Sequence, residues 1–377
     1  MVEGQCLFYL KRVITGILFQ RRSYINKDIC EDVKNIVLDD GESDLEINVR
    51  NKKKEKRKKN DSELASKQKA SEKSLSSYEE SLSETAKSYD SIGITQRETK
   101  DYKSALESHQ HALQIRLKLF GEDHSDTALS YNNIGNTQYE MKDYRSALES
   151  HQHALQIRLR LFGEDHSDTA LNYNNIGNTQ YNMKDYKSAL ESDKHALQIR
   201  LKLFGKDHSD TALSYNNIGV TQHKMKDYKS ALESHRHALQ IRLRLFGEDH
   251  SDTAGSYNYV GVIRHVTKDY NSALESYQHA LQIRLKLFGK DHSDTALSYH
   301  NIGITQRKMK DYKSALESHQ HAFQIRLKLF GKDHFDTALS YYNIKITQRE
   351  MEDSKLALES HQRNIFSFRE AKFLLKK

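Results

Sequence analysis

A histidine, a serine and two aspartates stand together in a short segment that returns in six copies, the last with Phe335 in place of the serine. One copy reads Asp165-His166-Ser167-Asp168. These residue types could form a hydrolase site with a serine nucleophile and a histidine base. Such catalysis needs one preorganised pocket, which repeated surface loops of nearly the same sequence do not provide. We therefore expect no enzyme activity and no small-molecule substrate, and we expect the Ser or Asp of each loop to cap the next helix.

Histidines two residues apart could also be read as metal ligands. The pairs are His109 and His111, His151 and His153, His235 and His237, and His319 and His321. On a helix, side chains two positions apart point about 200° away from each other, so one ion cannot bind both. Zinc held by histidines of successive repeats is a remote alternative. We expect histidines that are solvated or packed between repeats, with no metal and no cofactor.

The segments that carry these residues recur with a fixed period. The stretch Tyr144–Gly163 has near copies that begin at Tyr102, Tyr186, Tyr228, Tyr270 and Tyr312, so the starts lie 42 residues apart. A period of this size indicates stacked structural repeats. Apolar residues at helical spacing predict two helices in each unit, helix A (from Thr127 in one unit) and helix B (from Tyr144). Asp143 is placed to cap helix B and Gly163 to end it.

Small residues predict where the helices approach each other. Gly135 and Ala147 are expected where helices A and B cross. The last unit is degraded, because Lys345 replaces the crossing glycine and Ser354 the turn tyrosine, and we expect it to cap the array. The expected array covers 82–377, with units 85–126, 127–168, 169–210, 211–252, 253–294, 295–336 and the capping unit 337–377.

The region before the repeats differs in composition. Residues 1–50 match no repeat and stay unassigned, and residues 51–81 form a basic, Ser-rich linker that we expect to be disordered or loosely helical. The run from Lys52 to Lys59 is a solvated charge run, with a nuclear address or an anionic-surface contact as alternatives. The stretch from Cys6 to Phe19 is too short and too charged to span a bilayer, so a membrane partner is not expected.

The composition of the whole chain suits a thin array. Its 377 residues are 36% hydrophobic and 29% charged, which is polar for a compact globule but suits units that bury surface only against neighbours. The net charge of +7 is too mild to argue for nucleic acid. Cys6 and Cys30 lie outside the repeats, which favours a reducing, cytoplasmic setting.

The repeat residues resemble a known family. An aromatic followed by Ile-Gly, a turn tyrosine and two later alanines resemble the tetratricopeptide repeat, and the 42-residue length resembles the kinesin light chain and nephrocystin-3 variety. That resemblance covers residues 82–377 and implies an all-α, right-handed superhelix of helix-turn-helix repeats that binds other proteins. A kinesin light chain-like cargo adaptor is the alternative, although Leu64, Leu75, Tyr78 and Leu82 do not sustain the heptads of a motor-binding coiled coil.

The resemblance also implies where a ligand would lie. Helix A of this family lines the concave wall, along which extended peptides lie. Asparagine can pair with a peptide backbone, tyrosine offers contact area, and arginine can hold carboxylates, so we expect extended, acidic peptide segments. This stripe of helix A varies among the copies, which fits adaptation to a ligand or neutral drift. The candidate groove residues are Arg97, Asn132, Asn133, Asn136, Tyr139, Asn174, Asn175, Asn178, Tyr181, Asn216, Asn217, His223, Asn258 and Arg307.

A second class of function rests on basic residues near the end of each helix B. The ladder is Arg116, Arg158, Arg200, Arg242, Arg284 and Arg326, each followed two residues later by Lys or Arg. Such a stripe is a reason to consider nucleic acid. The alternative is that cations in the last turns of a helix interact favourably with its dipole. Interspersed glutamates and the lack of an aromatic platform disfavour nucleic acid, and a peptide-binding scaffold remains the preferred interpretation.

Overall fold

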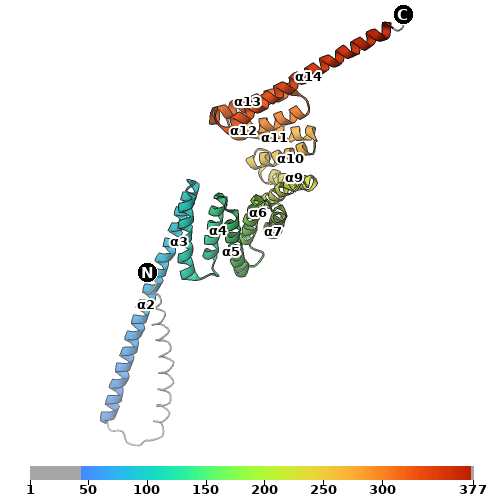
Figure 1. Cartoon of the computed structure of the whole chain (residues 1–377). Coiled ribbons are helices and arrows are strands. Elements are labelled where there is room, and N and C mark those ends of the chain that lie inside the picture. The colour runs from blue at the N-terminus through green and yellow to red at the C-terminus, as the bar shows by residue number, and fades with distance from the viewer. Residues whose placement is uncertain (1–43, 375–377) are drawn as a thin grey trace. The chain divides into compact units, whose positions relative to one another are not determined.

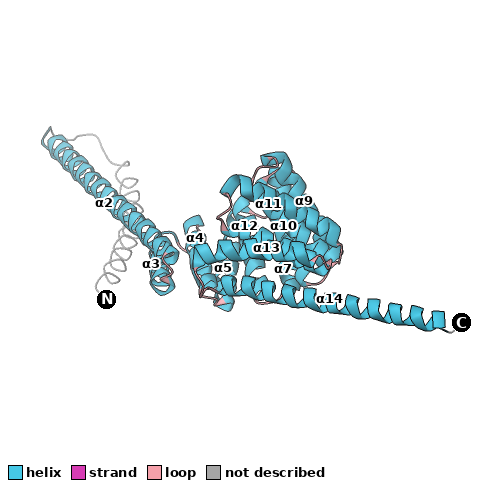
Figure 2. Cartoon of the chain, turned by 90° about the horizontal axis from the view of Figure 1, so that it is seen from above, coloured by secondary structure: helices cyan, strands magenta, loops and turns pink. Residues whose placement is uncertain are grey.

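The computed structural model describes residues 44–374, and every element of secondary structure in that range is a helix (Figures 1 and 2). The sequence also favours a poorly ordered N-terminal region, residues 1–50. Of these, residues 1–43 lie outside the described residues, and residues 44–50 belong to a helix. The helices are α2 (Asp44–Glu98), α3 (Tyr102–Phe120), α4 (Ser125–Glu140), α5 (Tyr144–Phe162), α6 (Ser167–Asn182), α7 (Tyr186–Phe204), α8 (Ser209–Lys224), α9 (Tyr228–Phe246), α10 (Ser251–Val266), α11 (Tyr270–Phe288), α12 (Ser293–Lys308), α13 (Tyr312–Phe330) and α14 (Phe335–Leu374).

These helices pair in sequence order to form a solenoid. Helix α4 packs on α5, α5 packs on α6, and the same contacts continue to α14. From α4 onward the even-numbered helices are helix A and the odd-numbered ones helix B of successive repeats. The part of α2 from Ser81 onward belongs to the same compact unit, Ser81–Lys377, and serves as the first helix A. The all-α solenoid predicted from the repeat period is confirmed.

The ends of the helices are fixed by local hydrogen bonds. Asp143 caps α5 as predicted, since its carboxylate accepts from the N–H of Ser146 at 3.3 Å. Gly163, at φ 77°, ends α5 in the left-handed region that favours glycine. The predicted Ser or Asp cap of helix A is wrong. His166 is the N-cap residue of α6, where its Nδ1 accepts from the N–H of Asp168 at 3.1 Å and its ring stacks on Phe162.

The crossing glycine makes room for a histidine. A Cβ at Gly135 would lie 2.6 Å from Cε1 of His151, whose side chain is fully buried. The same arrangement joins Gly93 to His109, Gly219 to His235 and Gly303 to His319. The helices therefore cross closely at Gly135, as predicted. The glycine is needed there because the histidine ring of helix B fills the space of a Cβ, and not because of a backbone contact at Ala147.

Each helix B also sends an arginine into the next repeat. The guanidinium of Arg158 donates to Oδ1 of Asn172 at 2.5 Å and to the carbonyl oxygen of Asp168 at 3.0 Å. In most other repeats a serine replaces Asn172, as where Arg242 donates to Ser256 at 2.7 Å. Because a buried guanidinium is stable only when it is hydrogen-bonded, these contacts tie consecutive repeats together.

Both terminal segments of the described chain are helical. Residues 51–81, expected to be a disordered or loosely helical linker, lie within α2. Most of their side chains are exposed, and pairs such as Lys67 with Glu63 at 2.8 Å support the helix locally. In the capping unit 337–377, where Lys345 and Ser354 replace the crossing glycine and the turn tyrosine, both halves form one continuous helix, α14, with no turn near Ser354.

Candidate functional site

The asparagines expected to form an open ladder are instead buried between repeats. Asn132, Asn174 and Asn216 are each less than 9% exposed. Oδ1 of Asn132 accepts from Nδ2 of Asn175 at 2.9 Å, and Oδ1 of Asn174 accepts from Asn217 at 3.0 Å. A buried amide needs such a partner, and the neighbouring repeat supplies it. The expectation that these three side chains face a ligand is corrected.

The ladder of amide pairs is interrupted between α8 and α10, and it ends at His300, whose Nδ1 has no hydrogen-bond partner among the described residues. Tyr259 stands where Asn175 and Asn217 stand in earlier repeats, and it stacks on the ring of His235 at 5.0 Å between centroids. Oδ1 of Asn216 is consequently left without a hydrogen-bond partner among the described residues. The ladder resumes where Asn258 accepts from Asn301 at 2.8 Å.

Five of the predicted residues do meet around one hollow. A cavity of about 330 Å³ lies against helix A of the first three repeats, α2, α4 and α6. Sequence reasoning missed the part played by Glu140 and His151, because His151 belongs to helix B and reaches the cavity under Gly135. The lining residues are Arg97, Asn136, Tyr139, Glu140, His151, Asn175 and Asn178.

Neighbouring side chains and burial determine the hydrogen bonds and the protonation of the groups around this cavity. The hydroxyl of Tyr139 accepts from Nδ2 of Asn182 at 2.8 Å, and its ring meets Tyr144 edge-on. Burial, reinforced by Tyr144, raises the pKa of Tyr139. Burial, with a smaller effect of Arg158, lowers the pKa of His151 to about 4, so the imidazole is neutral at pH 7. Arg97 has no ion-pair partner among the described residues and is the cation of this site.

The remaining predicted residues lie outside the cavity. Tyr181 is half-buried and meets Tyr186 edge-on, while His223 is half-buried beside Tyr228. Arg307 is paired with Glu350 of α14 at 3.4 Å. The structure thus gathers Arg97, Asn136, Tyr139, Asn175 and Asn178 and separates them from the others.

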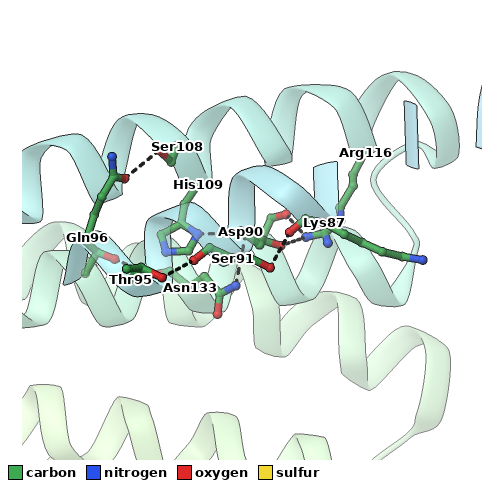
Figure 3. Close-up of polar contacts among 11 residues, drawn as sticks. Lys87, Asp90, Ser91, Thr95, Gln96, Ser108, His109, Arg116 and Asn133 are labelled. Carbon is green, nitrogen blue, oxygen red and sulfur yellow. Dashed lines mark hydrogen bonds and ion pairs between the residues drawn. The ribbon is translucent and has the colours of Figure 1, made fainter. Parts of the chain in front are cut away.

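Asn133 belongs to a different cluster of polar contacts, shown in Figure 3, whose members Asp90, His109 and Arg116 are buried. Its amide donates to Oδ1 of Asp90 at 3.3 Å, and Asp90 also contacts Nδ1 of His109 at 2.8 Å and Arg116 at 2.5 Å. Burial acts to raise the pKa of the Asp90 carboxyl, but His109, Arg116 and Asn133 together hold it below its ordinary value. The cluster is a buried ion pair that fastens the first repeat to the second.

The basic ladder offers little surface to nucleic acid. Its arginines are all at least 90% buried and hydrogen-bonded to the next repeat, and burial lowers the pKa of Arg158, Arg200 and Arg242. Several of the cations two residues later are paired with an aspartate of the preceding loop, as Arg160 is with Asp123 at 2.7 Å. The buried arginines of the ladder therefore connect consecutive repeats and form no exposed basic stripe.

Two further observations concern ligands and membranes. Within residues 44–374, no group of three or more His, Cys, Asp or Glu side chains lies close enough to hold a metal ion. No helix in that described part of the chain is both long and apolar enough to cross a membrane.

Comparison with solved structures finds the same architecture. BtubC (BKLC) from P. vanneervenii is similar with a TM-score of 0.55 and 20% identity, over 61% of this chain and 92% of that one. A kinesin light chain described as putative, from Podosopora anserina, with nearly identical TPR-like repeats, is similar with a TM-score of 0.50 and 13% identity, over 55% and 99%. The apo form of RapI is similar with a TM-score of 0.50 and 17% identity, over 70% and 75%. At these identities the likeness shows the fold alone.

The sequence itself gives the family. No curated protein sequence matches the chain. The tetratricopeptide repeat profile matches residues 84–160, 126–202, 168–244, 210–263, 252–328 and 306–363. The first five of these matches start 42 residues apart, which is the period predicted from the sequence. The chain therefore belongs to the tetratricopeptide repeat family.

Proposed function

We propose that the chain binds an extended peptide segment of another protein along helix A of its first three repeats. An array of these repeats is a protein-interaction scaffold and is typically non-catalytic. The observation that carries the proposal is the 330 Å³ cavity, which brings together five groove residues from α2, α4 and α6.

The lining indicates the chemistry of the ligand. Asn136 and Asn178 present amides that both donate and accept, as an extended peptide backbone requires. Arg97 provides a planar guanidinium for a carboxylate, and Tyr139 provides aromatic contact beside it. The carboxylate of Glu140, which lines the same cavity, would repel a second acidic side chain of the ligand. The best ligand is a peptide with one acidic side chain directed at Arg97 and uncharged or basic residues near Glu140.

The cavity is small for a folded domain but suits a few residues of an extended chain. Further contact would come from Tyr181 on α6 and His223 on α8, which continue the same helix A stripe. A role as a cargo adaptor for a motor has less support, because the likeness to kinesin light chain structures is a likeness of fold.

Selection from a phage library of 12-residue peptides on the full-length chain tests this proposal. Selected peptides should carry a recurrent Asp or Glu, and Arg97→Ala or Asn178→Ala should weaken their binding at least tenfold in a titration. Lys187→Ala, exposed on helix B, is the matched control and should leave binding unchanged. Binding that survives both groove substitutions, with melting temperatures unchanged, would show that the peptide lies elsewhere.

A further inference from the structure

The last repeat unit contains matching halves that do not fold back on each other. Residues 335–351 correspond to helix A of the preceding repeat, α12, and residues 354–374 correspond to helix B, α13, at the 42-residue offset. Between α12 and α13 the chain turns at Lys310, which has φ 66°. In the last unit both halves form the single helix α14.

One face of the first half of α14 is uncovered as a result. Tyr341 is 51% exposed and Tyr342 60% exposed. In the preceding repeat the residue equivalent to Tyr341 is Tyr299, whose ring stacks on His321 of helix B at 4.9 Å. Ala338 is likewise exposed, whereas the equivalent Ala296 is fully buried. The uncovered face is the one that helix B covers in every earlier repeat.

Two substitutions explain why the hairpin does not close. Gly303 lies so close to His319 that a Cβ there would be 2.7 Å from the ring, and the last repeat has Lys345 at that position. The amine of Lys345 instead lies 5.5 Å from the ring centre of Tyr341. The second change is Ser354, which replaces the aromatic Tyr312 that follows the turn. A hairpin with a three-residue turn forces a close crossing, and Lys345 obstructs it.

The second half of α14 nevertheless keeps the sequence of a helix B. Residues 357–362 read Ala-Leu-Glu-Ser-His-Gln, identical to residues 315–320 of α13. In α13 the alanine, serine and histidine of this sequence are buried against helix A. The chain therefore carries an uncovered helix A face and, further along the same continuous helix, the sequence of a helix B.

We propose that this face pairs with a second copy of the chain. Residues 335–351 of each copy pack antiparallel against residues 354–374 of the other, and a twofold axis relates the two α14 helices. This exchange restores the contact between helices A and B across two chains, as in domain swapping. Two separate helices lack the short turn, so they can cross at an angle that leaves room for Lys345 without a change of this register. The two copies present two peptide grooves, and a bivalent ligand would bind such a pair more tightly than one groove.

Engineered disulfides test the exchange in the full-length chain with Cys6→Ser and Cys30→Ser. Positions 341 and 363 correspond, one repeat later, to Tyr299 and His321, whose rings stack on each other. The first variant is therefore Tyr341→Cys combined with Arg363→Cys. Under mild oxidation we expect a covalent dimer on a non-reducing gel. Tyr299→Cys with His321→Cys is the matched control and should give a link within one chain. A link within one chain for the first pair, or no link at all, would overturn the proposal.

Light scattering gives an independent measurement. We expect the unmodified chain to show twice its 43.8 kDa mass. The variant Lys345→Gly with Ser354→Tyr restores the hairpin residues of the preceding repeats, and we expect it to shift to 43.8 kDa. A monomeric unmodified chain at micromolar concentration, or a variant that stays dimeric, would contradict the exchange.

Discussion

Replacing Asp193 by asparagine tests how the array tolerates a buried carboxyl group. Asp193 takes the position that His151 and His235 hold in the neighbouring repeats, and it is 3% exposed. Its Oδ2 accepts from Oγ1 of Thr221 at 3.3 Å, while Oδ1 has no hydrogen-bond partner among the described residues. Burial raises its pKa to about 7, although Thr221 and Arg200 oppose the rise.

The sign and size of the effect follow from this pKa. A carboxyl that titrates at 3.8 when unfolded and at about 7 when folded favours the folded state at low pH. That contribution is lost as the pH rises between the two values, by about 1.4 kcal/mol per unit. The free energy of unfolding is therefore lowered by roughly 2 kcal/mol at pH 5 and by roughly 4 kcal/mol at pH 8. Asp193→Asn removes this dependence, because an amide does not titrate.

Urea unfolding followed by circular dichroism at pH 5 and pH 8 measures the difference. We expect Asp193→Asn to raise the free energy of unfolding, and to raise it by roughly 2 kcal/mol more at pH 8 than at pH 5. Glu191→Gln removes an exposed carboxyl of the same helix and should change stability by less than about 0.5 kcal/mol at either pH. An equal gain for Asp193→Asn at both pH values would refute the reasoning, since the carboxyl would then not be titrating in the folded chain.

Two further predictions concern stability. Gly135→Ala places a Cβ 2.6 Å from the ring of His151 and should lower the free energy of unfolding by about 2 kcal/mol. Gly255→Ala, in open space on α10, should raise it by about 0.5–1 kcal/mol. A urea midpoint that rises for Gly135→Ala would contradict the first prediction, and one that falls for Gly255→Ala would contradict the second. Burial lowers the pKa of His151 and of His235 from 6.5 to about 4, so these neutral rings favour the folded state above pH 6.5. Stability should fall as the pH drops from 6.5 towards 4, and a melting temperature that stays constant over that range would exclude this effect.

The repeat period and the helix pairs could be predicted from the sequence because they depend on regular spacing. Asp143 and Gly163 correctly predict the start and the end of α5, because an N-cap carboxylate and a glycine with positive φ depend only on the neighbouring backbone. The true cap of helix A was missed, because it is the imidazole of His166, one residue before Ser167, that accepts from the N–H of Asp168. The position of this ring depends on the loop and on its stacking with Phe162, which are not local sequence signals.

The candidate groove was predicted only in part. Its periodic stripe contains both exposed and buried positions, and the sequence does not separate Asn132, which bonds the next repeat, from Asn136, which lines the cavity. Both are asparagines on one helix, four residues apart. Burial of Asn132 depends on where the next helix A packs, which is a tertiary contact. The same holds for Arg158, which looked like a surface cation but lies between two repeats.

The interruption of the amide ladder at Tyr259 has a mechanical consequence. Every repeat contacts only its neighbours, so a pulling force along the array is transmitted through each interface in turn. At the junction of α8 and α10 the oxygen of Asn216 is unpaired, and α10 also carries Gly255 in its interior. We expect this junction to open first under load, and to divide the array into an N-terminal part that holds the cavity and a C-terminal part that holds α14.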